Sequence, residues 1–127
     1  MKKTAVLCSV GLLSLAAIAW AGLAVSRETQ VDLVARTASG SVRDTRASAD
    51  TVQYIACFVS IPAPGAAAAV WCDARDAASE RLICSVSDPA FAQLAQSISA
   101  ASYVSFSCDA NGHLSSLTVN TGSQWMD

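Results

Sequence analysis

Hydrophobic and polar residues along this chain follow two periods, and the change of period predicts the secondary structure. Residues 52–61 (Val-Gln-Tyr-Ile-Ala-Cys-Phe-Val-Ser-Ile) are rich in β-branched and aromatic residues and end at the Pro-Ala-Pro-Gly cluster of residues 62–65. Two further apolar runs lie at 67–74 and 81–87, and the polar segment 73–80 between them is typical of a turn. The first half of the pattern therefore predicts three successive strands.

The period then becomes that of a helix. Asp88 and Pro89 form a helix start, with an aspartate cap followed by proline at the first helical position. The apolar residues that follow are spaced i, i+3, i+4 and i+7, and they are Phe91, Leu94, Ala95 and Ile98. This single apolar stripe predicts a helix that lies on a sheet.

Two more strands are predicted after the helix. Residues 102–109 alternate apolar residues with serine, and residues 113–120 follow Asn111-Gly112, a pair preferred in tight type I′ hairpins. We therefore expect an α+β fold of order β-β-β-α-β-β. About five strands would form one small antiparallel sheet, with the helix packed on one face and two disulfides.

Four cysteines lie in this predicted domain: Cys57, Cys72, Cys84 and Cys108. Each cysteine has an apolar residue two positions away, so in a strand both side chains would point to the same face. A hairpin centred between Pro64 and Gly65 would place Cys57 opposite Cys72, which favours Cys57–Cys72 with Cys84–Cys108. A turn centred on Ala78 would instead oppose Cys72 and Cys84, so the pairing stays open among the three connectivities that four cysteines allow. The chain has no Cys-x-x-Cys pair, which argues against zinc.

The first 21 residues have the features of a secretory signal peptide. Two lysines precede an apolar stretch that ends at Ala19-Trp20-Ala21, a small-x-small cleavage site. We expect cleavage before Gly22, with an uncleaved membrane anchor as the alternative. An exported chain would meet an oxidising compartment, which fits disulfides, so the predicted location is periplasmic or secreted in a bacterium.

Removal of the leader changes the charge and exposes a polar segment. The six arginines and ten acidic residues that remain give a formal charge of −4. This balance excludes a nucleic-acid partner and, after cleavage, a polybasic membrane-binding surface. Residues 22–50 are polar, with one short apolar patch, and predict a mobile N-terminal arm. The disulfide-linked domain is expected to span residues 51–127.

Candidate catalytic residues are few. His113 is the single histidine; Asp109 precedes it closely, but no Gly-x-Ser-x-Gly sequence accompanies them. Three carboxylates, of Asp73, Asp76 and Glu80, cluster near a predicted turn among arginines, as is typical of a solvated connection. We therefore predict no catalytic residue, no metal site and no cofactor.

The face of the predicted sheet opposite the cysteines is aromatic. Strict alternation places on it Tyr54, Phe58, Trp71, Ile83 and Tyr103. If this face is open rather than covered by the arm or by the tail through Trp125, it predicts a small non-enzymatic binding protein whose partner is an extracytoplasmic protein or glycan. The alternatives are a small secreted hydrolase that uses Asp73 and Asp76 or His113, and a structural envelope protein.

The run Tyr54-Ile55-Ala56-Cys57 in a small exported chain with two disulfides resembles the periplasmic lysozyme inhibitors in general outline. The resemblance implies an inhibitor as one version of the binding role. It covers a handful of residues, and the chain lacks the Ser-Gly-x-Gly type of loop and the clustered basic contacts, so no family is assigned.

Overall fold

The computed structural model describes residues 27–122, so the predicted leader and Trp125 lie outside the described residues. Seven strands and two helices form within this range. In chain order they are β1 (Gln30–Asp32), β2 (Thr37–Ser41), α1 (Val42–Ala47), β3 (Tyr54–Ser60), β4 (Ala69–Arg75), β5 (Arg81–Val86), α2 (Pro89–Gln96), β6 (Tyr103–Cys108) and β7 (Leu114–Asn120). From β3 onward, the predicted order of three strands, a helix and two strands is confirmed.

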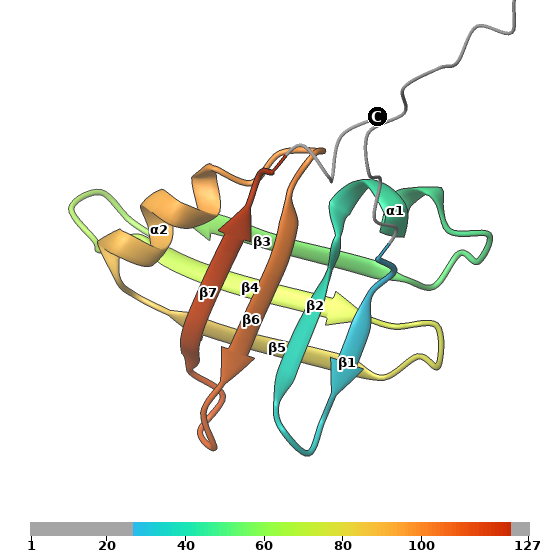
Figure 1. Ribbon diagram of the computed structural model, residues 1–127. Coiled ribbons are helices and arrows are strands. Elements are labelled where there is room, and N and C mark those ends of the chain that lie inside the picture. The colour runs from blue at the N-terminus through green and yellow to red at the C-terminus, as the bar shows by residue number, and fades with distance from the viewer. Residues whose placement is uncertain (1–26, 123–127) are drawn as a thin grey trace, which may run out of the picture.

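The strands form two antiparallel sheets rather than the single five-stranded sheet predicted from the pattern. One has the order β1-β2-β6-β7 and is called the four-stranded sheet; the other has the order β3-β4-β5 and is called the three-stranded sheet. Figure 1 shows their strands crossing at a steep angle. The α+β class holds, but β6 pairs with β2 over five residue pairs and with β7 on its other side. Neither edge of β6 is left for the three-stranded sheet.

The N-terminal segment also differs from the predicted mobile arm, since β1, β2 and α1 all lie within residues 22–50. Strand β2 pairs with β1 and β6, and its Gly40 lies close to Thr29 next to β1. A Cβ atom added to Gly40 would lie 3.0 Å from the Cα of Thr29. The Thr29 hydroxyl is itself buried and lies 2.8 Å from that of Thr45 on α1. Ser41 is the N-cap of α1, and its Oγ accepts the Asp44 N–H.

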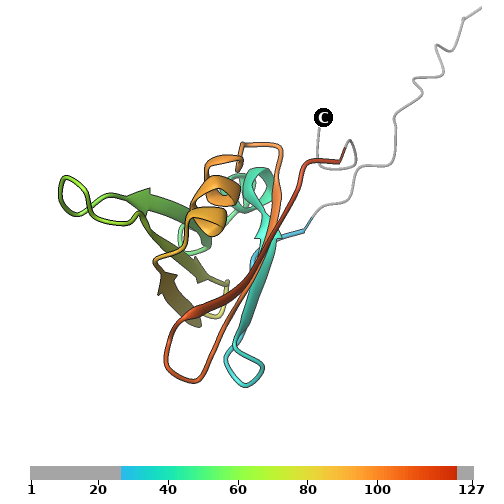
Figure 2. The ribbon, with the colours of Figure 1, turned by 90° about the vertical axis from the view of Figure 1, so that its left-hand side faces the viewer.

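The core lies between the two sheets, and α2 fills one end of it. Helix α2 contacts β3 and β4 on one side and β7 on the other, and Figure 2 shows it between the sheets. The predicted cap is confirmed, because the Asp88 carboxylate accepts the N–H groups of Ala90 and Phe91. Ala92 and Ala95 are its buried residues. Within residues 27–122, neither helix is long and apolar enough to cross a membrane.

Both disulfides form in the pairing that the hairpin geometry favoured. Cys57–Cys72 joins neighbouring strands β3 and β4, where these residues lie directly opposite each other. Cys84–Cys108 joins β5 to β6 and therefore connects the two sheets through the core. Two disulfides indicate folding in an oxidising environment outside the cytoplasm.

The hairpin between β6 and β7 differs from the predicted type I′ turn. Gly112 has a φ of 81°, whereas Asn111 is not in the left-handed region. The Gly112 N–H donates to the Asp109 carbonyl at 3.2 Å, and the Asp109 N–H donates to the His113 carbonyl at 2.8 Å. This is a type I turn followed by a left-handed glycine, the usual three-residue hairpin loop.

Candidate binding face

The outer surface of the three-stranded sheet collects most of the predicted site residues. Alternation along its strands sends Ile55, Val70 and Leu82 into the core and the intervening residues outward. The outward residues lie in three rows across the strands, and we call them the outer face: Tyr54, Arg75 and Arg81; Ala56, Asp73 and Ile83; Phe58, Trp71 and Ser85.

One end of the outer face is aromatic. Phe58 and Trp71 are direct cross-strand neighbours, and their rings stack with centroids 5.5 Å apart and planes 14° from parallel. Phe58 is 50% exposed and Ile83 47% exposed, although both sit on strands whose other side is core. Figure 2 shows no helix or strand from residues 27–122 on the outer side of this sheet. The described part of the N-terminal segment therefore does not cover it.

The other end of the outer face is a network of charges around Asp73. The Arg81 Nε donates to the Asp73 carboxylate at 2.9 Å, and Nη2 donates to its second oxygen. The Tyr54 hydroxyl donates to the same carboxylate at 3.1 Å. The Arg75 guanidinium carbon lies 5.8 Å from the centre of the Tyr54 ring, within cation–π distance. These contacts connect all three strands on their outer side.

The network sets the protonation of its members. Burial raises the pKa of Asp73, but the hydrogen bonds from Arg81 and Tyr54, together with the charges of both arginines, outweigh it and lower the pKa overall. Burial, followed by the Asp73 carboxylate, raises the pKa of Tyr54. At neutral pH the network therefore contains an ionised Asp73 and a neutral Tyr54.

Asp73→Asn is expected to lower the free energy of unfolding by about 1 kcal/mol at pH 7, once the solvent screening of Arg81 is allowed for. Because folding lowers the pKa of Asp73 below its unfolded value of about 3.9, the carboxylate stabilises the protein fully above that pH. The contribution is lost as the pH falls through the folded pKa. Urea unfolding of both proteins at neutral and acidic pH measures this.

The matched control is Glu80→Gln, since Glu80 is an exposed acid next to Arg81 in sequence. This change is expected to alter the unfolding free energy by less than about 0.5 kcal/mol at either pH. A difference between wild type and Asp73→Asn that keeps its size in acid would contradict an origin in the carboxylate charge.

Tyr103 does not belong to the outer face. It lies on β6 of the four-stranded sheet, opposite Ser41 on β2 and Asn120 on β7. Its predicted place next to Trp71 followed from the assumption of a single sheet. The structure thus brings together Tyr54, Phe58 and Trp71 with Ile83, and leaves Tyr103 on the other sheet.

The charged end of the outer face was missed as part of the site. The segment 73–80 was interpreted as a turn, whereas β4 continues to Arg75, β5 begins at Arg81, and these two residues pair across the strands. The sequence does contain a signal for a longer strand, because Trp71, Asp73 and Arg75 are spaced two residues apart and would lie on one face. Charged residues on an exposed strand face and in a turn look alike without the pairing.

The candidate catalytic groups are spread over β4, which carries Asp73, and two turns. The Asp76 carboxylate accepts the Glu80 N–H at 3.0 Å and closes the turn between β4 and β5. His113 Nδ1 lies 3.3 Å from the Asp109 carboxylate, and the Ser85 N–H bonds to the Gly112 carbonyl beside it. Among residues 27–122, no serine hydroxyl bonds to the imidazole, and no group of three His, Cys, Asp or Glu side chains is placed to hold a metal ion.

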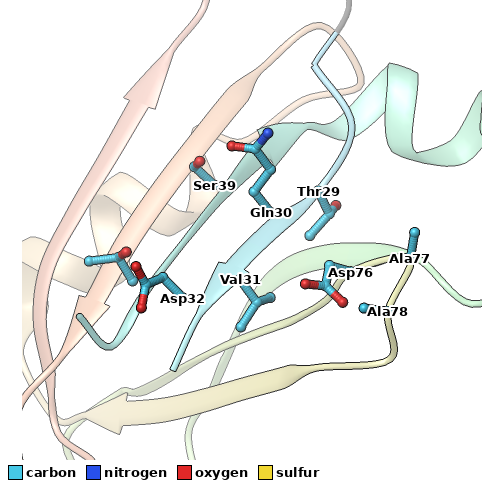
Figure 3. A pocket seen from close by; sticks show the side chains of 9 residues that line it. Thr29, Gln30, Val31, Asp32, Ser39, Asp76, Ala77 and Ala78 are labelled. Atoms are coloured by element: carbon cyan, nitrogen blue, oxygen red, sulfur yellow. The ribbon is translucent and has the colours of Figure 1, made fainter. Parts of the chain in front are cut away.

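A polar cavity of about 600 Å³ lies between the β1–β2 hairpin and the turn after β4 (Figure 3). Its two carboxylates already have backbone partners. Asp32 accepts the N–H groups of Val34 and Ala35, and Asp76 accepts that of Glu80. These carboxylates hold the turns that border the cavity.

Comparisons with known proteins found no match to this chain among protein-family models, curated proteins or solved structures. The function proposed below therefore rests on the chemistry of the outer face.

Proposed function

We propose that this protein is a small non-enzymatic binding module that acts in the periplasm or outside the cell. Its outer face would hold an extracytoplasmic protein or glycan. The observation that carries the proposal is the stacked pair of Phe58 and Trp71 on a sheet surface that faces away from the core, with Phe58 half exposed. Large aromatic side chains dominate the energetics of binding surfaces when they are open to a partner.

Rigidity of the outer face supports this role. Cys57–Cys72 links the two strands that carry the aromatic pair, and the Asp73 network fixes the other end of the face. A surface that is ordered before binding pays little conformational entropy when the partner arrives. Apolar rings beside hydrogen-bonding groups fit a sugar ring, which has an apolar side and a hydroxylated edge, or an amphipathic protein patch.

The proposal of a non-enzymatic role rests on the contacts that the candidate catalytic groups already make. Asp73 is paired with Arg81, and Asp76 accepts a backbone N–H. His113 and its Asp109 neighbour are both exposed beside the β6–β7 turn. A general acid or base acts from a cleft that aligns it with a substrate proton, and these groups instead stabilise turns or the outer face.

Trp71→Ala is expected to weaken ligand binding by about 30-fold, the effect of losing a hot-spot side chain worth about 2 kcal/mol. Ligands are first selected from glycan arrays and from envelope extracts with the oxidised protein as bait. The selected ligand is then titrated calorimetrically with wild type and variant, while circular dichroism checks that the variant keeps its fold.

Tyr103→Ala is the matched control, because it removes an aromatic residue from the other sheet. It is expected to leave the affinity unchanged. Equal losses for Trp71→Ala and Tyr103→Ala, or no loss for Trp71→Ala, would reject the outer face as the binding surface.

A further inference from the structure

Strand β3 pairs with β4 along one edge, and no strand among residues 27–122 pairs with its other edge. Cys57 and Cys72 lie opposite each other with a Cα–Cα distance of 4.1 Å. This is near the value of about 4.5 Å for a pair that exchanges no backbone hydrogen bonds, and well below the value of about 5.5 Å for a hydrogen-bonded pair. The N–H and C=O of Cys57 therefore point away from β4, and so do those of Ile55 and Val59, two residues to either side.

No backbone hydrogen bond to other described residues takes up these groups, whereas the far edge of the same sheet does receive one, from Ser85 to Gly112. Natural sheets usually protect a free edge with charged residues, proline or a bulge. Strand β3 has none of these, since its sequence is Tyr-Ile-Ala-Cys-Phe-Val-Ser and its pairing with β4 is regular. Among residues 27–122, no strand pairs with this edge, and none of the seven residues of β3 is charged.

We propose that a second copy of this chain pairs with this edge, antiparallel and symmetric about Cys57. In this register Cys57 faces Cys57 of the partner subunit, and Ile55 faces Val59 of the partner subunit. The backbone groups of these facing residues all point outward, so each of these pairs exchanges two N–H···O bonds, and the Phe58–Ala56 pairs between them exchange none. No other symmetric register centred within β3 gives hydrogen-bond partners to the outward backbone groups of all three residues in both copies.

The side chains of the outer face fit this register. Phe58 lies opposite Ala56 of the partner subunit, so a large aromatic side chain meets the smallest side chain of the strand. Ala56, Phe58 and Ser60 are exposed in the single chain, so the partner strand would cover accessible surface. No charged side chain of β3 opposes another. The two three-stranded sheets would become one sheet of six strands with both Phe58–Trp71 stacks on the same side.

Sedimentation equilibrium of the purified, oxidised protein over about 5–500 μM measures the association, with a shift from monomer to dimer mass as the expected result. Amide exchange by NMR identifies the edge. The Ile55, Cys57 and Val59 amides should exchange slowly when the protein is concentrated and faster on dilution. The Phe58 amide, which points toward β4, should exchange slowly at both concentrations. A monomer throughout, or edge amides indifferent to concentration, would overturn the proposal.

Ala56→Lys adds a charge beside the edge at an exposed position and is expected to raise the dimer dissociation constant at least about tenfold. The control is Thr118→Lys, an exposed position on β7, the long edge strand of the other sheet. A dimer broken by Thr118→Lys and not by Ala56→Lys would place the interface on β7 and reject it on β3.

A second variant, Val59→Pro, removes an outward N–H while sparing the bonds to β4, and should also give a folded monomer. Because association is measured without ligand, its failure leaves the proposed binding function untouched.

Discussion

Phe106→Ala is expected to lower the free energy of unfolding by about 3–5 kcal/mol. Phe106 is 1% exposed and is one of the largest fully buried side chains of the described chain. It lies on β6, between Ala38 on β2 and Leu117 on β7. Its ring faces the core between the sheets, so truncation leaves a cavity that the alanine and leucine beside it cannot fill. Chemical denaturation followed by fluorescence measures the change.

Phe58→Ala provides the comparison, because the same atoms are removed from a half-exposed position. Only the stacking with Trp71 and part of the buried area are lost, so a cost of about 1 kcal/mol is expected. Similar costs at the two positions would contradict the assignment of Phe106 to the core and Phe58 to the surface.

Replacing Cys84 and Cys108 together with alanine is expected to cost about 3–4 kcal/mol. Opening a disulfide with a sequence separation of 24 residues returns conformational entropy to the unfolded chain. The bond also joins β5 to β6 across the two sheets, so its loss weakens the contact that encloses the core. The midpoint of urea denaturation of the double variant measures the effect.

The other disulfide is the control. Cys57 and Cys72 are separated by 15 residues, for which loop closure alone predicts about 3 kcal/mol. Their strands are already paired over seven residues of each, so we expect a smaller loss than for the link between sheets. A larger loss on removing Cys57–Cys72 would contradict this ranking.

The elements that sequence predicted well are specified by neighbouring residues. Residues 88–89 form the start of α2 through a cap and a proline, and both act within one helical turn. The Pro-Gly turn fixed the register of β3 and β4, and with it the pairing of Cys57 and Cys72. Period-two alternation gave the two faces of each strand, which located Phe58 and Trp71 on the same side.

What could not be predicted depends on contacts between distant segments. Strand β2 reads Thr-Ala-Ser-Gly-Ser, which has neither the β-branched content nor the alternation of a typical strand. It is a strand because β6 pairs with it, and because Gly40 allows Thr29 to approach. Because the sequence does not predict β2, it does not predict the second sheet either, and Tyr103 was placed with the wrong partners. The Asp73 network was not predicted for a related reason, since Tyr54, Asp73 and Arg81 come together only when β3, β4 and β5 pair.

The position of Cys72 makes the disulfide pairing depend on the contact between the two sheets. Cys72 lies on the middle strand of its sheet, directly opposite Cys57 on one side and Cys84 on the other. Within that sheet alone, both neighbours compete for the same sulfur. Only when β6 brings Cys108 against β5 does Cys84 acquire a partner of its own. The final pairing of Cys84 therefore depends on the contact between the two sheets, whereas that of Cys57 depends on one hairpin.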